Sequence, residues 1–95
     1  MIVGICHLDL IIPENRSLKG KRQVIRRIID RVRTRFNISI AEVGDNELWQ
    51  RCQLGISLVG NDRRFVNSSL DRVVNFIEGM NVVDIAHSEL EILNV

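Results

Sequence analysis

The chain has 95 residues, of which 13 are Lys or Arg and 12 are Asp or Glu, so its formal net charge is only +1. One domain over residues 1–95 fits this length, and 45% apolar with 26% charged residues excludes an intrinsically disordered chain. No apolar run reaches the ~20 residues of a membrane-spanning helix, and no basic segment precedes the first apolar stretch. We therefore expect a cytosolic protein with no leader and no membrane contact.

The first half of the sequence predicts a strand, a helix and a second strand. Residues 2–12 are rich in Ile, Val and Leu and end at Pro13, which cannot continue a ladder of hydrogen bonds. Ser17 stands where an N-cap belongs, and apolar residues recur from there to about Phe36 at the three- and four-residue spacing of a helix. Alternation over residues 38–44 then predicts the second strand.

The second half repeats the pattern in the order strand, helix, strand. In residues 52–59, the apolar side chains of Cys52, Leu54, Ile56 and Leu58 alternate with Gln53, Gly55, Ser57 and Val59. Gly60-Asn61-Asp62 predicts a turn and a cap, after which apolar spacing predicts a second helix that ends at Gly79 in a left-handed conformation. The last strand is predicted over residues 82–93.

The order β-α-β-β-α-β predicts an α+β, ferredoxin-like fold, with an antiparallel four-stranded sheet and two helices on one face. Right-handed crossovers place the first and third strands in the centre. The other face of the sheet stays open. We expect it to carry Val3, Ile5, His7, Asp9, Ile11, Arg51, Gln53, Ser57, Val59, Ile85, His87, Glu89 and Glu91, with Val83 turned the same way.

Charge is distributed very unevenly along the chain. Residues 16–35 hold nine cations and one acid, a net +8, whereas the other 75 residues hold four cations and eleven acids, a net −7. Seven of the nine are Arg, which binds phosphate bidentately. A nucleic-acid backbone suits such a helix, although a charge run is also typical of a solvated face. The predicted nucleic-acid or anion contacts are Arg16, Lys19, Lys21, Arg22, Arg26 and Arg33.

The start of the first helix offers a narrower alternative. Arg16, Lys19, Lys21 and Arg22 surround free backbone amides at the positive end of the helix dipole, which is typical of a phosphate or sulfate site. This would make the protein an enzyme or sensor of a small phosphorylated ligand. Ser17 acting only as a cap is the simpler interpretation.

The segment 44–51 holds the only Trp of the chain. Trp49 and Arg51 could contact a nucleic acid, with the indole stacked on a base. We favour the alternative that Trp49 and Leu48 close the end of the core. Base stacking on the sheet is excluded, because there is no Tyr and the three Phe residues lie in or beside the helices.

Catalytic chemistry has no clear signature. The sequence contains no phosphate-binding Gly loop, nucleophile elbow or paired-His motif, so we predict no catalytic residue and no cofactor. His7, Asp9, His87, Glu89 and Glu91 could share the open face, but alternating polar residues are usual on a solvated sheet face, and Cys6 and Cys52 have no partner at metal-ligand spacing. We expect buried reduced thiols and no metal.

Two classes of function remain besides the phosphate-ligand alternative. The first is a non-enzymatic RNA-binding or ribosome-associated protein, with Arg22, Arg26 and Arg33 at the centre of the contact. The second is a structural or regulatory homodimer that buries the open sheet face. Its apolar centre would consist of Val3, Ile5, Ile11, Val59 and Ile85.

The chain resembles the YlxP-like family of small bacterial proteins in several motifs. These are the opening MIVGICHLDL, the helix start Ser17-Leu18-Lys19, Phe36-Asn37, Ala41-Glu42-Val43-Gly44-Asp45, Leu48-Trp49-Gln50-Arg51 and Val59-Gly60-Asn61-Asp62. The resemblance implies a ferredoxin-like domain and a bacterial cytosolic protein. Family members are commonly encoded beside translation initiation and ribosome maturation factors, which implies a link to RNA or the ribosome. The family implies no catalytic residue.

Overall fold

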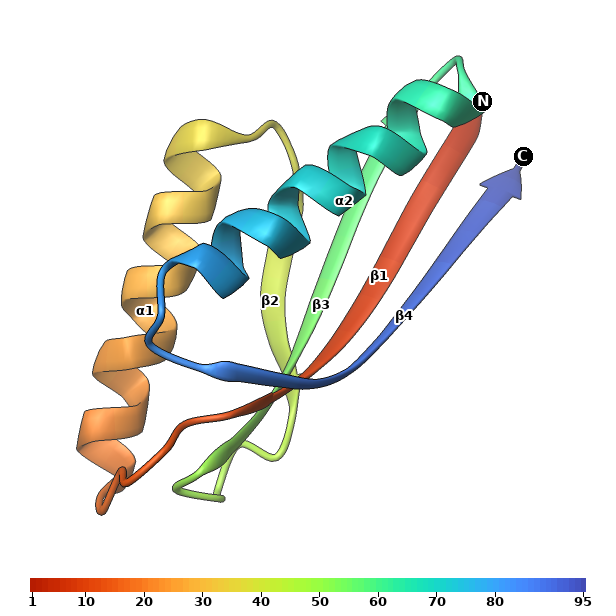
Figure 1. Ribbon diagram of the computed structural model, residues 1–95. Helices are drawn as coiled ribbons and strands as arrows, with labels where there is room; N and C mark the ends of the chain where they lie inside the picture. The colour runs from red at the N-terminus through yellow and green to blue at the C-terminus, as the bar shows by residue number, and fades with distance from the viewer.

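The computed structural model describes residues 1–95 and contains an antiparallel four-stranded sheet with two helices against it (Figure 1). The strands lie in the order β2-β3-β1-β4. This confirms the predicted ferredoxin-like α+β fold, with the first and third strands in the centre. The elements are β1 (Ile2–Ile11), α1 (Leu18–Arg35), β2 (Ser39–Gly44), β3 (Arg51–Gly60), α2 (Arg63–Gly79) and β4 (Asp84–Asn94).

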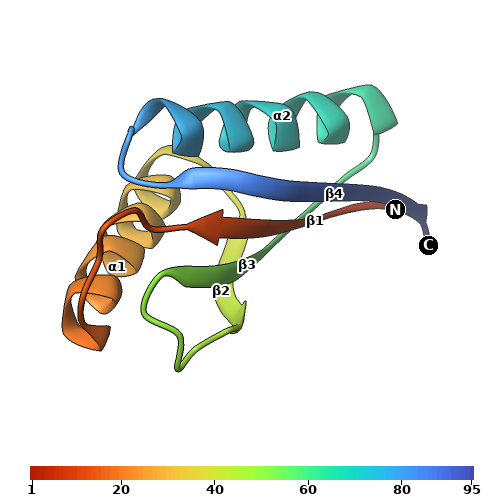
Figure 2. The same ribbon diagram turned by 60° about the horizontal axis from the view of Figure 1, so that its bottom comes forward.

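One face of the sheet packs on the helices and the other has no helix over it (Figure 2). In β1 the even-numbered side chains are buried against the helices and the odd-numbered ones are not, as the alternation predicts. The pairs Val3–Val59, Ile5–Ser57 and Ile11–Arg51 lie opposite one another in β1 and β3, which places their side chains on the open face. Neither helix is long and apolar enough to cross a membrane.

A close approach of α2 to β1 depends on Gly4. A Cβ atom at this position would lie 2.5 Å from Val66 Cγ1 and 2.8 Å from Leu70 Cδ1, and both of those residues are fully buried. Val66 is β-branched and packed on all sides, so it cannot rotate away at low cost. The helix rests on the sheet at this point because no side chain intervenes.

Replacing Gly4 by Ala is expected to lower the free energy of unfolding by about 1–3 kcal/mol, the usual cost of overpacking a core. Urea unfolding followed by circular dichroism measures it. The matched control is Gly79→Ala in α2, where a Cβ would meet nothing within 4 Å. That change should stabilise the helix by up to about 1 kcal/mol. Equal stability of the two variants would contradict the close approach at Gly4.

Both helices begin at the predicted caps. The Ser17 side chain accepts a hydrogen bond from the Gly20 amide at 2.9 Å, and the Asp62 side chain accepts one from the Arg64 amide at 3.1 Å. The predicted left-handed end at Gly79 is wrong, because Gly79 is still helical and the residue with positive φ is Asn81, at 58°. Asn tolerates this conformation well among non-Gly residues, so the chain turns two residues later than predicted.

The face predicted for the start of the last strand is also wrong. The pairing between β1 and β4 shifts between Asp9, which lies opposite His87, and Leu10, which lies opposite Ile85. Because the bulge absorbs one residue, Ile85 packs beside the core and Val83 is buried in it. Beyond the bulge, His87, Glu89 and Glu91 lie on the open face, as predicted.

Candidate nucleic-acid interface

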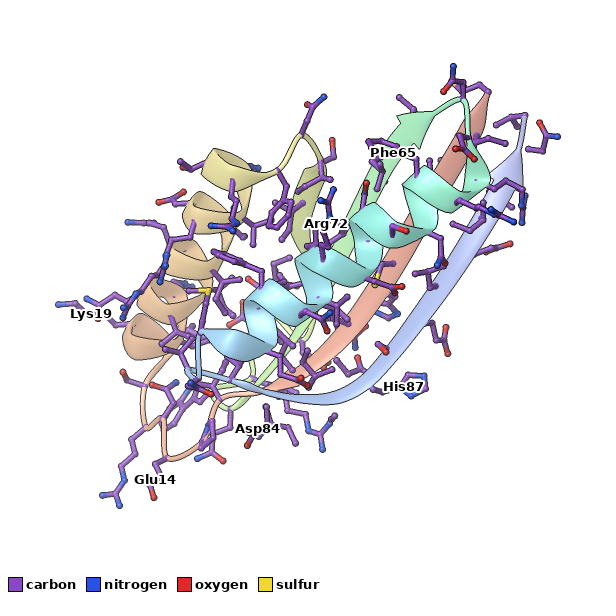
Figure 3. The ribbon with its side chains drawn as sticks, turned by 45° about the horizontal axis from the view of Figure 1, so that its top comes forward. Glu14, Lys19, Phe65, Arg72, Asp84 and His87 are labelled. Atoms are coloured by element: carbon purple, nitrogen blue, oxygen red, sulfur yellow. The ribbon has the colours of Figure 1, made fainter.

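The cations of α1 form two rows on either side of its buried seam. At 100° per residue from Ile25, one row lies at about 60–120° and the other at about 200–280°. We call the first the outer row (Lys19, Arg22, Arg26 and Arg33) and the second the inner row (Arg27, Arg31 and Arg35), and all seven side chains are exposed. The outer row lies along the β2 edge, where Arg33 Nη2 donates to the Ile40 carbonyl oxygen at 3.1 Å. Figure 3 shows Lys19 extending from α1 into solvent.

The inner row faces the second helix. The Arg31 guanidinium lies 5.5 Å from the ring centre of Phe76, and the Arg35 guanidinium lies 5.2 Å from the same ring. Arg35 also lies 6.0 Å from Phe36, whose ring meets Phe76 edge to face. These contacts are at the distance of cation–π attraction, so they hold the guanidinium groups without neutralising them.

No carboxylate forms an ion pair with a cation of these rows. The structure contains two ion pairs within 4.0 Å, Lys21 with Glu42 and His87 with Glu89. No Arg residue of the protein takes part in either. Together with Arg16, which is also exposed, α1 and the residue before its cap therefore present eight cations with no acidic partner. The attraction of these cations for an anionic partner is therefore not offset by an ion pair within the protein.

Lys21 does not belong to this surface, and its assignment as an anion contact is wrong. It is 1% exposed, because it lies on the seam of α1 that packs on the sheet. Its Nζ lies 3.0 Å from Glu42 Oε2 and donates to the Asp45 carbonyl oxygen at 2.5 Å. The cation is thus used inside the protein, where it ties the start of α1 to the end of β2.

The same buried pair affects a neighbouring thiol. Cys52 and Cys6 are both free and buried, as predicted. Burial and, second, the negative charge of Glu42 raise the pKa of the Cys52 thiol from 9.0 to about 12. Burial also raises the pKa of Cys6, with a smaller contribution from Asp71. Both thiols therefore stay protonated at neutral pH, which makes them poor nucleophiles because the thiolate is the reactive form.

These raised thiol pKa values predict a loss of stability at alkaline pH. Since the folded-state pKa lies above the unfolded one, the contribution is fully present below about pH 9 and is lost as pH rises toward 12. Between these pH values the free energy of unfolding should fall by up to about 1.4 kcal/mol per pH unit through Cys52. Urea midpoints at pH 8 and pH 10.5 measure this, and Cys52→Val should reduce the slope. A Cys52→Val variant with an unchanged slope would contradict it.

The start of α1 is occupied by side chains of the protein itself. Asn15 Nδ2 donates to the carbonyl oxygens of Ser17 and Trp49, at 2.8 and 2.6 Å, and Gln50 Nε2 donates to the Asn15 carbonyl oxygen at 3.0 Å. Ser17 caps the Gly20 amide. With Lys21 turned inward as well, the phosphate site predicted here loses one of its cations and one of its amides.

Trp49 does not close the core, so the packing role favoured for it is wrong. Its side chain is 53% exposed, and Leu48 is exposed beside it. The loop is held through its backbone by Asn15 and Gln50, which leaves the indole free. Trp49 therefore lies beside the segment that carries Arg16. Arg51 is exposed at the start of β3 and lies opposite Ile11 on the open face, away from the rows of α1.

Polar groups on the open face form two short networks. His7 Nε2 and Gln53 Oε1 are 2.9 Å apart, and Gln53 Nε2 donates to Asp45 Oδ2 at 3.1 Å. His87 Nε2 lies 3.0 Å from Glu89 Oε1 and is exposed, pointing away from the sheet edge in Figure 3. His7 is opposite Glu89 and His87 is opposite Asp9. No group of three or more His, Cys, Asp or Glu residues is arranged to hold a metal ion.

A second basic feature was missed by the sequence analysis. We call it the interhelical groove, a hollow of about 200 Å³ between the end of α1 and the first half of α2. The residues that line it include Arg35, Phe36, Leu58, Phe65, Ser69 and Arg72. Figure 3 shows Phe65 and Arg72 on the side of α2 that faces α1. The signal was present, because the core seam of α2 does not need Phe65, and a large apolar residue outside the seam marks a surface feature.

Known proteins match this chain in sequence and in fold. The family model described as protein of unknown function (DUF503) matches residues 3–90. The chain is similar to the uncharacterized protein YlxP of Bacillus subtilis (strain 168), with 37% identity over 83 residues that cover 87% of this chain and 90% of the relative.

Among solved structures, the chain is similar to the de novo designed protein Foldit4 and to the structural genomics protein YJCS. The match to Foldit4 has a TM-score of 0.55 at 13% identity and covers 100% of this chain and 99% of the Foldit4 chain. The second has a TM-score of 0.51 at 8% identity and covers 98% of both chains. At these identities the likeness shows the fold alone.

Proposed function

The chain belongs to the DUF503 family of proteins of unknown function, and we propose that it is a non-enzymatic RNA-binding protein that contacts phosphates through α1. The observation that carries the proposal is the set of eight exposed cations without a carboxylate partner. Six of these eight are Arg residues within α1, and Arg holds its charge at every physiological pH. The resemblance to proteins encoded beside translation factors favours ribosomal or other translation-associated RNA.

Repulsion within α1 supports a polyanionic partner. Arg22 and Arg26, and Arg27 and Arg31, are like charges four residues apart, and each such pair destabilises a helix by about 0.2–0.5 kcal/mol. The first turn of α1 contains no acidic residue, which would interact favourably with the positive end of the helix dipole. Bound phosphates would relieve this repulsion, and the counterions they release would add to the affinity.

The geometry favours recognition of shape over recognition of sequence. α1 has 18 residues, which gives a length of about 27 Å, and the outer row extends along most of it. Arg and Lys contacts to phosphates position a protein on RNA without reading its bases. We therefore expect α1 to bind structured RNA with little dependence on base sequence.

The salt dependence of RNA binding tests the proposal. Fluorescence anisotropy with a labelled RNA hairpin should give a plot of log Kd against log salt whose slope corresponds to about four to six neutralised phosphates. Capture from a bacterial cytosol, with and without nuclease, should recover RNA that nuclease removes. The proposal is overturned if the wild-type protein binds no structured RNA at low salt.

A homodimer through the open face is a second candidate, and one observation favours it. Aliphatic side chains are exposed on that face of the sheet, with Val59 62%, Val43 57% and Ile5 39% exposed. A contiguous apolar patch on a small domain is often covered by a partner. The outer row of α1 would remain free in such a dimer, so the two proposals are compatible.

Sedimentation velocity over a range of concentrations tests the homodimer. We expect a dimer that Val59→Lys converts to a monomer, because a buried unpaired ammonium opposes association. A control substitution on the edge strand, Ser88→Lys, should leave the dimer intact. A strict monomer at high concentration would remove this candidate.

A further inference from the structure

The interhelical groove has the chemistry of a site for one unpaired base. In Figure 1 the two helices diverge from the end of α2 toward its start. The residues that line the cavity come from the end of α1, the end of β3 and the first half of α2. Leu58 and the buried Ser69 are at its floor, and Phe65 is at its rim with 56% of its surface exposed. The exposed ring is available for stacking.

One of the two cations of the groove, Arg35, is held in place before a ligand binds. Arg35 is stacked against Phe36 and Phe76, at 6.0 and 5.2 Å from their ring centres. Arg72 lies one turn along α2 from Ser69 and is exposed. Neither guanidinium has a carboxylate within 4.0 Å. An exposed aromatic ring and two guanidinium groups without a carboxylate partner line the same groove, and this combination matches a nucleotide, which has an aromatic base and an anionic phosphate.

The size of the cavity limits what can enter. Sites for whole small molecules usually measure about 300–1,000 Å³, and this one measures about 200 Å³. One ring can be accommodated while the sugar and phosphate remain at the rim beside the guanidinium groups. A base-paired nucleotide cannot enter, because its base is stacked inside a duplex.

We propose that the interhelical groove binds one unpaired nucleotide of the RNA, with the base against Phe65 and the phosphate between Arg35 and Arg72. The inference rests on the proposed RNA binding and adds a preference for RNA with an unpaired segment. The outer row and the groove would contribute differently to RNA binding. The outer row attracts the backbone without selectivity, and the groove selects a loop, bulge or single-stranded end.

Two RNAs with the same number of phosphates distinguish these contributions. One is a hairpin with an unpaired loop, and the other is a fully paired blunt duplex. The wild-type protein should bind the hairpin more tightly. Phe65→Ala should weaken hairpin binding by about 5- to 150-fold, the effect of losing one stacked base, and leave duplex binding unchanged. Phe65→Trp, which keeps an aromatic ring at this position, should bind the hairpin as tightly as the wild type.

Arg72→Gln is compared with Arg63→Gln, an exposed Arg of α2 outside the groove, and only Arg72→Gln should remove the preference for the hairpin. Circular dichroism checks that each variant is folded. The inference is overturned if Phe65→Ala binds both RNAs like the wild type or loses affinity for both equally. If the wild type binds neither RNA, RNA binding itself fails. Equal wild-type affinity for both RNAs, unchanged in Phe65→Ala, removes the groove alone.

Discussion

Replacing Lys21 by Met is expected to lower the free energy of unfolding by about 3 kcal/mol, the lower end of the cost of breaking a buried ion pair. Glu42, which is 21% exposed, would lose the ammonium that lies 3.0 Å away, and the Asp45 carbonyl would lose its donor. The lower end applies because Glu42 keeps some contact with water. In a domain of this size, the melting temperature should fall by at least about 12 °C.

Lys19→Met is the matched control. Lys19 lies two residues before Lys21 and is exposed, so the substitution removes the same charge from the protein surface. It should change the free energy of unfolding by less than about 0.5 kcal/mol. The double variant Lys21→Met, Glu42→Leu should recover most of the loss, since apolar residues often replace a buried pair at little cost. If Lys21→Met is as stable as Lys19→Met, the buried pair does not stabilise the fold.

Reversing three charges of the outer row is expected to abolish RNA binding at moderate salt. Arg22→Glu, Arg26→Glu and Arg33→Glu together change the charge of residues 16–35 from +8 to +2. Each lost phosphate contact should reduce the slope of log Kd against log salt by about one, so the slope should fall by about three. All three side chains are exposed, so the fold should persist apart from the bond of Arg33 to Ile40.

A variant with the same net charge separates a local contact from a general effect. Arg51→Glu, Arg63→Glu and Arg64→Glu also lower the net charge by six, but none of these residues lies on α1. This control should retain most of the affinity and most of the salt slope. Equal losses in the two triple variants would show that net charge alone governs binding, which would contradict a role for the outer row.

The helices and the inward face of the sheet follow from periodicity, and the burial of Lys21 follows from the same rule. At 100° per residue, Lys21 lies at about 320° from Ile25, between Ile28 at about 300° and Val32 at about 340°. Glu42 shares the alternation of Ile40, which is buried in β2. Two opposite charges at inward positions predict an ion pair. The charge count of residues 16–35 does not reveal this pair, because it treats Lys21 like the exposed cations.

Other features could not be read from local patterns. The bulge beside Asp9 depends on how β4 pairs with β1, and no residue in 84–94 marks the shift of register. Trp49 is exposed because Asn15, far away in the sequence, holds the backbone of its loop. The interhelical groove needs the angle between the two helices, which is set by tertiary packing. The charges of Arg35 and Arg72 can be read from the sequence, but their place in one groove with Phe65 cannot.

Amide chemical-shift changes on titration with an RNA hairpin locate the RNA contact on the molecule and so test whether it lies on α1. The largest changes should fall on residues 16–35, with a second set around Phe65 and Arg72 and little change in the open-face residues of β4. Raising the salt concentration should reverse the changes on α1 first. Changes confined to the open sheet face, or no changes at low salt, would contradict RNA binding through α1.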